Sequence, residues 1–99
     1  MGEKLSPREL ALYRATDEVL HYIWDPIGVA KAPEARDEYH AYLPRVFGML
    51  REGRTVQDIA AYLTSVTRDR IGLDARSDHD IGVARLLIRW KEAVAARYA

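Results

Sequence analysis

Acidic and histidine side chains in the first 40 residues are the ones whose types and spacing could support chemistry. They are Asp17, His21, Asp25, Asp37, Glu38 and His40. The first three follow one another at four-residue intervals, which places them on one side of a helix. Imidazole and carboxylate groups bind hard or borderline divalent cations, and they also transfer protons. His21, Asp25, Asp37, Glu38 and His40 are therefore candidate metal ligands or acid/base groups, provided that the two chain segments meet.

The same residues also have an ordinary structural interpretation. Asp17 and His21 suit a solvated pair on a helix surface, and Asp25 suits the first position of a turn. Asp37 and Glu38 suit the start of a helix, where negative charge is favourable. The chain lacks a His-Glu-x-x-His pair, a repeated Glu-x-x-His motif and a glycine-rich phosphate loop. We therefore assign no catalytic residue and no cofactor from these patterns.

Turn and capping signatures divide the chain into four predicted helices. The segment Trp24-Asp25-Pro26-Ile27-Gly28 ends the first amphipathic stretch, and its Asp, Pro and Gly match type I turn chemistry. Capping signatures begin at Ser6, Thr55 and Ser77. Together with apolar residues at three- and four-residue spacing, they predict helices over residues 7–24, 34–52, 56–71 and 78–98.

The second and fourth predicted helices have unusual patterns. Apolar and aromatic residues from Tyr39 to Leu50 keep one helical phase through Pro44, which predicts a single helix bent at the proline. In the fourth helix, apolar residues cover roughly 220° of the circumference. Either this helix is central, or its edge formed by Val83, Leu86 and Trp90 faces a partner chain. The sequence thus predicts one compact, antiparallel, all-α four-helix domain over residues 1–99.

Composition narrows the class of partner. Lys plus Arg and Asp plus Glu each number 15, so no overall field attracts a polyanion. A modest basic strip of Arg85, Arg89 and Arg97 is the only feature that favours nucleic acid. The absence of cysteine fits a reducing cytosol, and no apolar run reaches the length of a membrane span. We expect a cytoplasmic protein without a membrane partner.

A resemblance adds to this interpretation. The residues that carry it are Trp24-Asp25-Pro26-Ile27-Gly28, Asp37-Glu38-Tyr39, Tyr42 and Pro44, with weaker similarity as far as Ile71-Gly72-Leu73. The chain resembles a group of small, uncharacterised bacterial helical proteins, a domain of unknown function with a Trp-Asp-Pro-Ile-Gly turn and a following Asp-Glu-Tyr segment. In that group the next residue is usually acidic, whereas here it is His40, which weakens the case for a purely carboxylate site. The resemblance implies a bacterial origin and an all-helical fold, and by analogy an immunity role beside a toxin.

Three functions follow from these patterns. The first is a non-enzymatic interaction protein, of immunity or accessory type, that binds another protein or forms a homodimer through helix four. Tyr and Trp often anchor such interfaces. The candidate contact residues are Trp24, Asp25, Tyr39, Tyr42, Val83, Leu86 and Trp90. The alternatives are a small metal-dependent or acid/base enzyme and a weak nucleic-acid binder.

Overall fold

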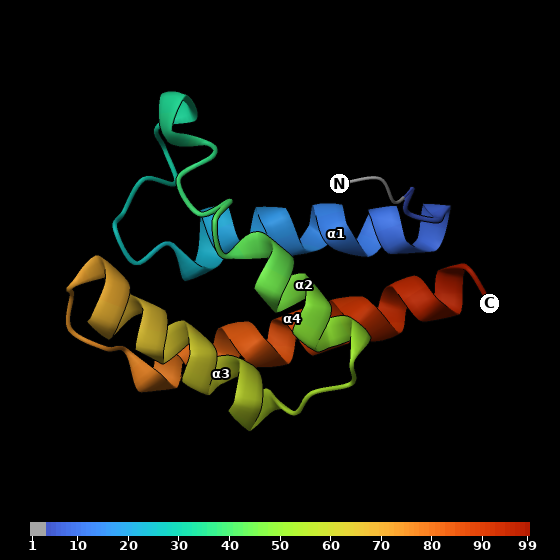
Figure 1. The fold of residues 1–99 in the computed structure, drawn as a ribbon. Coiled ribbons are helices and arrows are strands. Elements are labelled where there is room, and N and C mark those ends of the chain that lie inside the picture. Colours follow the sequence, from blue (N-terminus) through green and yellow to red (C-terminus); the bar gives the residue numbers. More distant parts are fainter. Residues whose placement is uncertain (1–3) are drawn as a thin grey trace.

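The computed structural model describes residues 4–99, so Met1–Glu3 at the start of the predicted domain lie outside the described residues. The described part is helical, and it contains no strand. Its four α-helices are α1 (Pro7–Val19), α2 (Leu43–Arg51), α3 (Val56–Ser65) and α4 (Ser77–Arg97), shown in Figure 1. The Cα radius of gyration is 13.2 Å, close to the value of about 13 Å for a folded chain of 100 residues. The predicted compact, all-α class is confirmed.

Two helices begin with the capping boxes that the sequence predicts. At α1, Ser6 Oγ accepts the backbone N–H of Glu9 at 3.1 Å, and Glu9 Oε1 accepts the backbone N–H of Ser6 at 2.9 Å. At α3, Thr55 and Asp58 make the same reciprocal pair. Each box satisfies two backbone donors that a helix start leaves free. The α4 helix begins instead at Ser77 without a side-chain cap.

Wider helical turns extend α1 and α3. The π-helical turns η1 (Leu20–Trp24) and η3 (Val66–Ile71) follow directly, so the helical paths end where the sequence predicts. Each path stops at a residue in the left-handed region, Asp25 with φ of 32° and Gly72 with φ of 82°. Glycine adopts this conformation without steric cost, whereas an aspartate there needs local hydrogen bonds to hold it.

The second predicted helix is much shorter than expected. Instead of a helix over 34–52, a short 3-10 turn, η2 (Pro33–Ala35), is followed by further turns, and α2 begins only at Leu43. Pro44 therefore lies in the first turn of α2, and the bend expected at this proline is not seen. A helix running through residue 44 would lose a backbone hydrogen bond to residue 40, and the proline ring would clash with that carbonyl. In the first turn, proline costs nothing.

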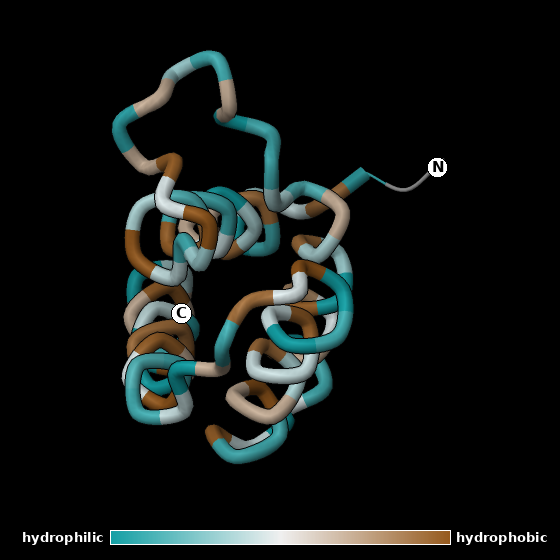
Figure 2. Tube along the Cα trace, turned by 90° about the vertical axis from the view of Figure 1, so that its left-hand side faces the viewer, coloured by the Kyte–Doolittle hydropathy of each residue, from teal (hydrophilic) through white to brown (hydrophobic). Residues whose placement is uncertain are grey.

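The chain between η1 and α2 projects away from the helices. Residues 25–42, which we call the 25–42 segment, carry η2 at their outer end (Figure 1). Figure 2 shows that this segment consists mostly of hydrophilic and weakly hydrophobic residues. Its inner end is different, because Tyr39 belongs to the buried core. The segment is thus attached to the helices through a few specific side chains.

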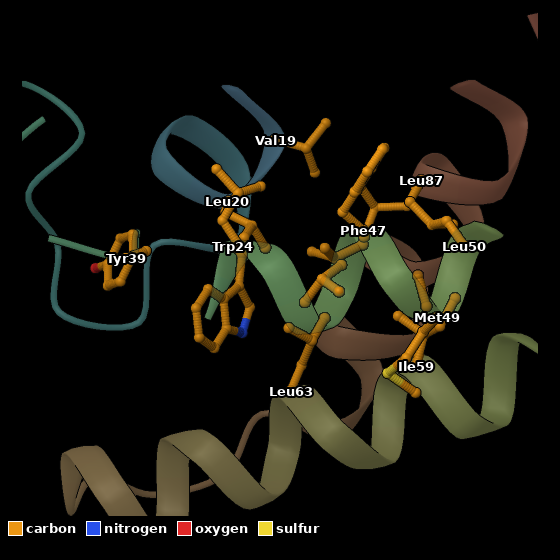
Figure 3. Packing of buried hydrophobic residues seen from close by; sticks show 14 of the residues in the cluster. Val19, Leu20, Trp24, Tyr39, Phe47, Met49, Leu50, Ile59, Leu63 and Leu87 are labelled. Atoms are coloured by element: carbon orange, nitrogen blue, oxygen red, sulfur yellow. The ribbon is translucent and has the colours of Figure 1, made fainter. Parts of the chain in front are cut away.

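The core lies where α4 meets the other helices. The α4 helix contacts α1, α2, α3 and η1, which supports the central position, one of the two alternatives that its broad apolar surface left open. Val83 and Leu87 of α4 are buried, and Trp24 of η1 is completely buried. In Figure 3, Trp24 and Leu63 of α3 point toward each other within this cluster. None of the helices in residues 4–99 is long and apolar enough to cross a membrane.

The start of α4 also holds the end of η1. Arg76 Nη2 donates to the Trp24 carbonyl at 2.7 Å. The Nε2 atom of His79 lies 2.8 Å from the Ile23 carbonyl and 3.2 Å from that of Trp24. Carbonyls at a helix end have no partner within the helix, so these side chains supply one. The corner after Trp24 is therefore bonded to α4.

Candidate functional site

Asp25 fixes the corner that the sequence singled out. Its Oδ1 accepts the backbone N–H groups of Gly28 at 3.0 Å and Val29 at 2.7 Å. Its Oδ2 accepts the backbone N–H of Ala30 at 3.0 Å. The Gly28 N–H also lies 3.3 Å from the Asp25 carbonyl, as in the predicted turn. Three backbone donors on one carboxylate explain how a non-glycine residue keeps a positive φ.

Tyr39 completes this corner from the far end of the 25–42 segment. Its hydroxyl donates to Asp25 Oδ1 at 2.7 Å and accepts the Ile27 backbone N–H at 3.0 Å. Its ring is buried, with its centroid 5.2 Å from that of Trp24. The carboxylate of Asp25 and the hydroxyl of Tyr39 therefore bond to each other and to backbone N–H groups of the same segment. The corner is a structural device that closes the 25–42 segment onto the core.

The two side chains shift each other's proton affinity. Burial raises the pKa of Asp25, but the Tyr39 hydroxyl and the three backbone N–H groups outweigh it, so the net pKa lies below the ordinary 3.8. Burial and the hydrogen bond to Asp25 raise the pKa of Tyr39 far above 10. At neutral pH the pair is thus a carboxylate that accepts from a neutral phenol. Neither group has a pKa suited to proton transfer near neutrality.

The candidate metal ligands do not assemble into one site. His21 is buried, while Asp37 and Glu38 are exposed on the 25–42 segment. Asp25 is engaged in its turn, and His40 Nε2 lies 3.1 Å from Asp17 Oδ1. Across residues 4–99, no three His, Asp or Glu side chains are grouped so that they could hold a metal ion. The four-residue spacing on α1 therefore does not lead to a coordination site.

Asp17 has a different role from the one that its spacing suggested. Arg36 Nη1 donates to Asp17 Oδ1 at 2.9 Å, and this ion pair raises the pKa of Arg36. The Arg36 guanidinium also lies 5.4 Å from the centre of the Tyr22 ring. Asp17 therefore ties residues that follow η2 to α1 through Arg36 and His40. No spacing rule in the sequence connects residues 19 and 23 positions apart.

The candidate contact residues separate into buried and exposed groups. Trp24, Tyr39 and Val83 are at most 2% exposed, so the folded chain does not present them to a partner. Asp25, Tyr42 and Leu86 are half-buried. Trp90 is different, because 44% of its surface is exposed. Turn chemistry placed Asp25 in a turn, and helical periodicity placed the other six residues on apolar faces, but neither pattern showed which face another helix covers.

A groove between α1 and α4 lies next to Trp90. We call it the α1–α4 groove, and its volume is about 380 Å³. It is lined by Ala11, Arg14, Ala15, Glu18, Trp90, Ala93, Val94, Arg97 and Tyr98. Tyr98 is 43% exposed, so two large aromatic side chains with free surface flank a set of small residues. A shallower hollow that also involves Leu86 and Arg89 continues it along α4.

Sequence reasoning missed most of this groove. An alanine on a helix signals nothing by itself, so Ala11, Ala15 and Ala93 did not stand out. The signal in the sequence was Trp90 and Tyr98, which stand two turns apart on one helix. The groove depends on the pairing of α1 with α4, which a helical wheel does not give.

No match was found when the chain was compared with models of protein families, with curated proteins and with solved structures.

Proposed function

We propose that this chain is a non-enzymatic protein-interaction domain that binds its partner in the α1–α4 groove. The observation that carries the proposal is the exposure of Trp90 and Tyr98, at 44% and 43%, about two turns apart on the α4 side of one groove. Trp and Tyr dominate binding energy at interfaces, because each buries a large rigid surface at a small cost in conformational entropy. In a groove between two helices, a bound partner contacts these aromatic side chains and the facing helix at the same time.

The position of the groove on the fold supports this proposal. Both walls are α-helices, and α4 packs centrally against the other helices. Val94, at the bottom of the groove, is buried. Side chains on such elements keep their geometry better than those on loops, which reduces the entropy lost on binding. The 25–42 segment, by contrast, uses its conspicuous residues to hold its own shape.

The partner in the groove is either a different protein or a second copy of this chain, and experiments distinguish the two. One is binding of a different protein, as an immunity or accessory protein of a bacterial cytoplasm. The other is self-association through α4. Light scattering after gel filtration measures self-association, and affinity capture from a bacterial lysate measures binding to other proteins. Both are run on the wild type and on a variant that carries Trp90→Ala and Tyr98→Ala.

The matched control is Tyr22→Ala, which removes an aromatic ring that is 54% exposed away from the groove. We expect the double variant to lose the bound protein or the dimer, and the Tyr22 variant to keep it. Circular dichroism checks that both variants stay folded. A wild-type chain that is monomeric and captures nothing, or a partner that the double variant retains, would overturn the proposal.

A further inference from the structure

We infer that the occupant of the α1–α4 groove is an acidic amphipathic helix from another protein. This inference rests on the proposed function and adds the chemistry of the partner.

The dimensions of the groove suit a helix. Trp90, Val94 and Tyr98 follow one another at four-residue spacing along α4, and Ala11 and Ala15 do the same on α1. Eight residues of helix cover about 12 Å, at 1.5 Å per residue. A bound helix presents anchors at positions i, i+4 and i+7 over the same distance. Alanines on both walls allow the backbone of such a helix to approach closely.

The charge of the groove selects for acidic flanks. Among residues 4–99, Arg14 and Arg97 line the groove, Arg89 lines its continuation, and Glu18 is the only acidic lining residue. In the part of the chain that the structure describes, none of these three arginines forms an ion pair; the pairs there involve other residues. A cationic rim around an apolar floor is complementary to a helix with apolar anchors and carboxylates beside them.

The same charge argues against the two competing occupants. In a two-fold dimer through this groove, each copy would bring three arginines and one glutamate to the interface, and this surplus of like charge is costly. A single-stranded nucleic acid would place its phosphates near Glu18 and its bases on an alanine-lined floor with two aromatic rings. The zero net charge of the chain gives such a polyanion no long-range attraction.

Peptide selection tests the inference even though the partner is unidentified. The immobilised wild-type chain is used to select from a displayed library of random peptides of about 16 residues, long enough as a helix to span the groove. A counter-selection uses Ala93→Trp, which fills the groove at an exposed position without changing its charge. We expect the enriched peptides to carry apolar residues at helical spacing, an excess of Asp and Glu, and no binding to the Ala93→Trp variant.

Charge reversal provides the quantitative test on one enriched peptide. A variant with Arg14→Glu and Arg97→Glu should bind it about tenfold more weakly, given the modest contribution of each exposed ion pair. The control Arg45→Glu changes an exposed arginine on α2 and should leave the affinity unchanged. Higher salt should weaken binding to the wild type and should have less effect on the doubly reversed variant.

The ways in which the inference can fail are distinct. Enriched peptides that need the groove but are neutral or basic would overturn the inference and leave the proposed function standing. A wild-type dimer that Trp90→Ala with Tyr98→Ala dissolves would do the same, as would groove-dependent binding of oligothymidylate in place of peptides. If no enriched peptide depends on the groove and the wild type neither dimerises nor captures a protein, the inference and the proposed function both fail.

Discussion

At the scale of single residues, the hydrogen bonds of Asp25 and Tyr39 show that the turn after Trp24 has a structural role. The sequence places Asp25 in a tight turn beside Trp24 and follows it with Asp37-Glu38-Tyr39, a pattern that suggested metal binding or acid/base catalysis. In the fold, the carboxylate accepts three backbone N–H groups and one phenol, and the phenol accepts a fourth backbone N–H. These bonds use the polar atoms of both side chains. Their energy supports the fold.

The first prediction concerns the Tyr39 hydroxyl. Tyr39→Phe keeps the buried ring but removes one donor to Asp25 and the acceptor of the Ile27 N–H. We expect the free energy of unfolding to fall by about 1–2 kcal/mol, because a partly buried polar group loses its partner. Urea denaturation measures it. Tyr22→Phe, at an exposed ring, serves as the control, and equal stability of the two variants would contradict the role assigned to Tyr39.

The second prediction follows from the lowered pKa of Asp25. A carboxyl group whose pKa is lower in the folded than in the unfolded chain stabilises the fold above pH 3.8, and this stabilisation is lost as the pH falls through the folded-state pKa. The stability difference between wild type and Asp25→Asn should therefore be constant near neutrality and shrink below pH 3.8. Urea titrations at several pH values measure it. A difference that grows on acidification would refute the assignment.

At the scale of elements, the sequence predicted helix ends better than helix interiors. The capping boxes at Ser6 and Thr55 and the left-handed stop at Gly72 depend on neighbouring residues, so local patterns identified them. The helix expected over 34–52 was wrong in its first half. Residues 36–42 form turns, so the apolar spacing there did not indicate a helix, and the steric effect of Pro44 on the preceding turn prevailed.

The candidate site was less predictable than the fold, for a physical reason. The groove depends on which face of α1 packs beside α4, and the burial of His21, Trp24 and Tyr39 depends on tertiary contacts. A helical wheel identifies the apolar face of each helix, but it does not show which other helix packs against that face. The exposure of Trp90, by comparison, was foreseeable as the outer edge of an apolar surface too wide for one contact.

Two glycines provide the third prediction, at this scale. Gly48 lies inside α2 and Gly72 ends η3 with φ of 82°, and at neither does an added Cβ meet an atom within 4 Å. Gly48→Ala should stabilise the fold by about 0.5–1 kcal/mol, because alanine loses less entropy in a helix. Gly72→Ala should destabilise it by about 1 kcal/mol, because a side chain is strained at positive φ. Thermal unfolding compares the two, and shifts of the same sign would contradict the backbone conformations of these two glycines.

At the scale of the whole molecule, the helices and the 25–42 segment differ in how they are held. The helices share one core in which α4 is central. The 25–42 segment is attached by the Asp25–Tyr39 bond, by Asp17, which binds Arg36 and His40, and by the packing of Val29 and Tyr42 against the core. Because few contacts hold it, this segment should open without unfolding of the core.

Limited proteolysis gives the fourth prediction. In the non-helical connections, trypsin should cut first after Lys31, which is exposed, whereas Arg36, Arg54 and Arg76 are held by hydrogen bonds or ion pairs. Asp25→Ala should accelerate this cut about tenfold, which corresponds to about 1.4 kcal/mol less resistance to local opening. Mass spectrometry of the early fragments locates the cut. A first cut after Arg54 or Arg76, or an unchanged rate, would contradict this view of the segment.

The bond between Asp25 and Tyr39 has a consequence for how this chain can vary in length. It closes a loop in which Val29 packs against the core and Arg36 bonds to Asp17, whereas residues 31–35 do not belong to the core cluster. The entropy of closing such a loop rises only slowly with its length, by about 0.6 kcal/mol for each doubling. Extra residues inserted after Lys31 should therefore be tolerated while the helices keep their packing. The segment is the position at which this domain can accept a foreign peptide or a second domain.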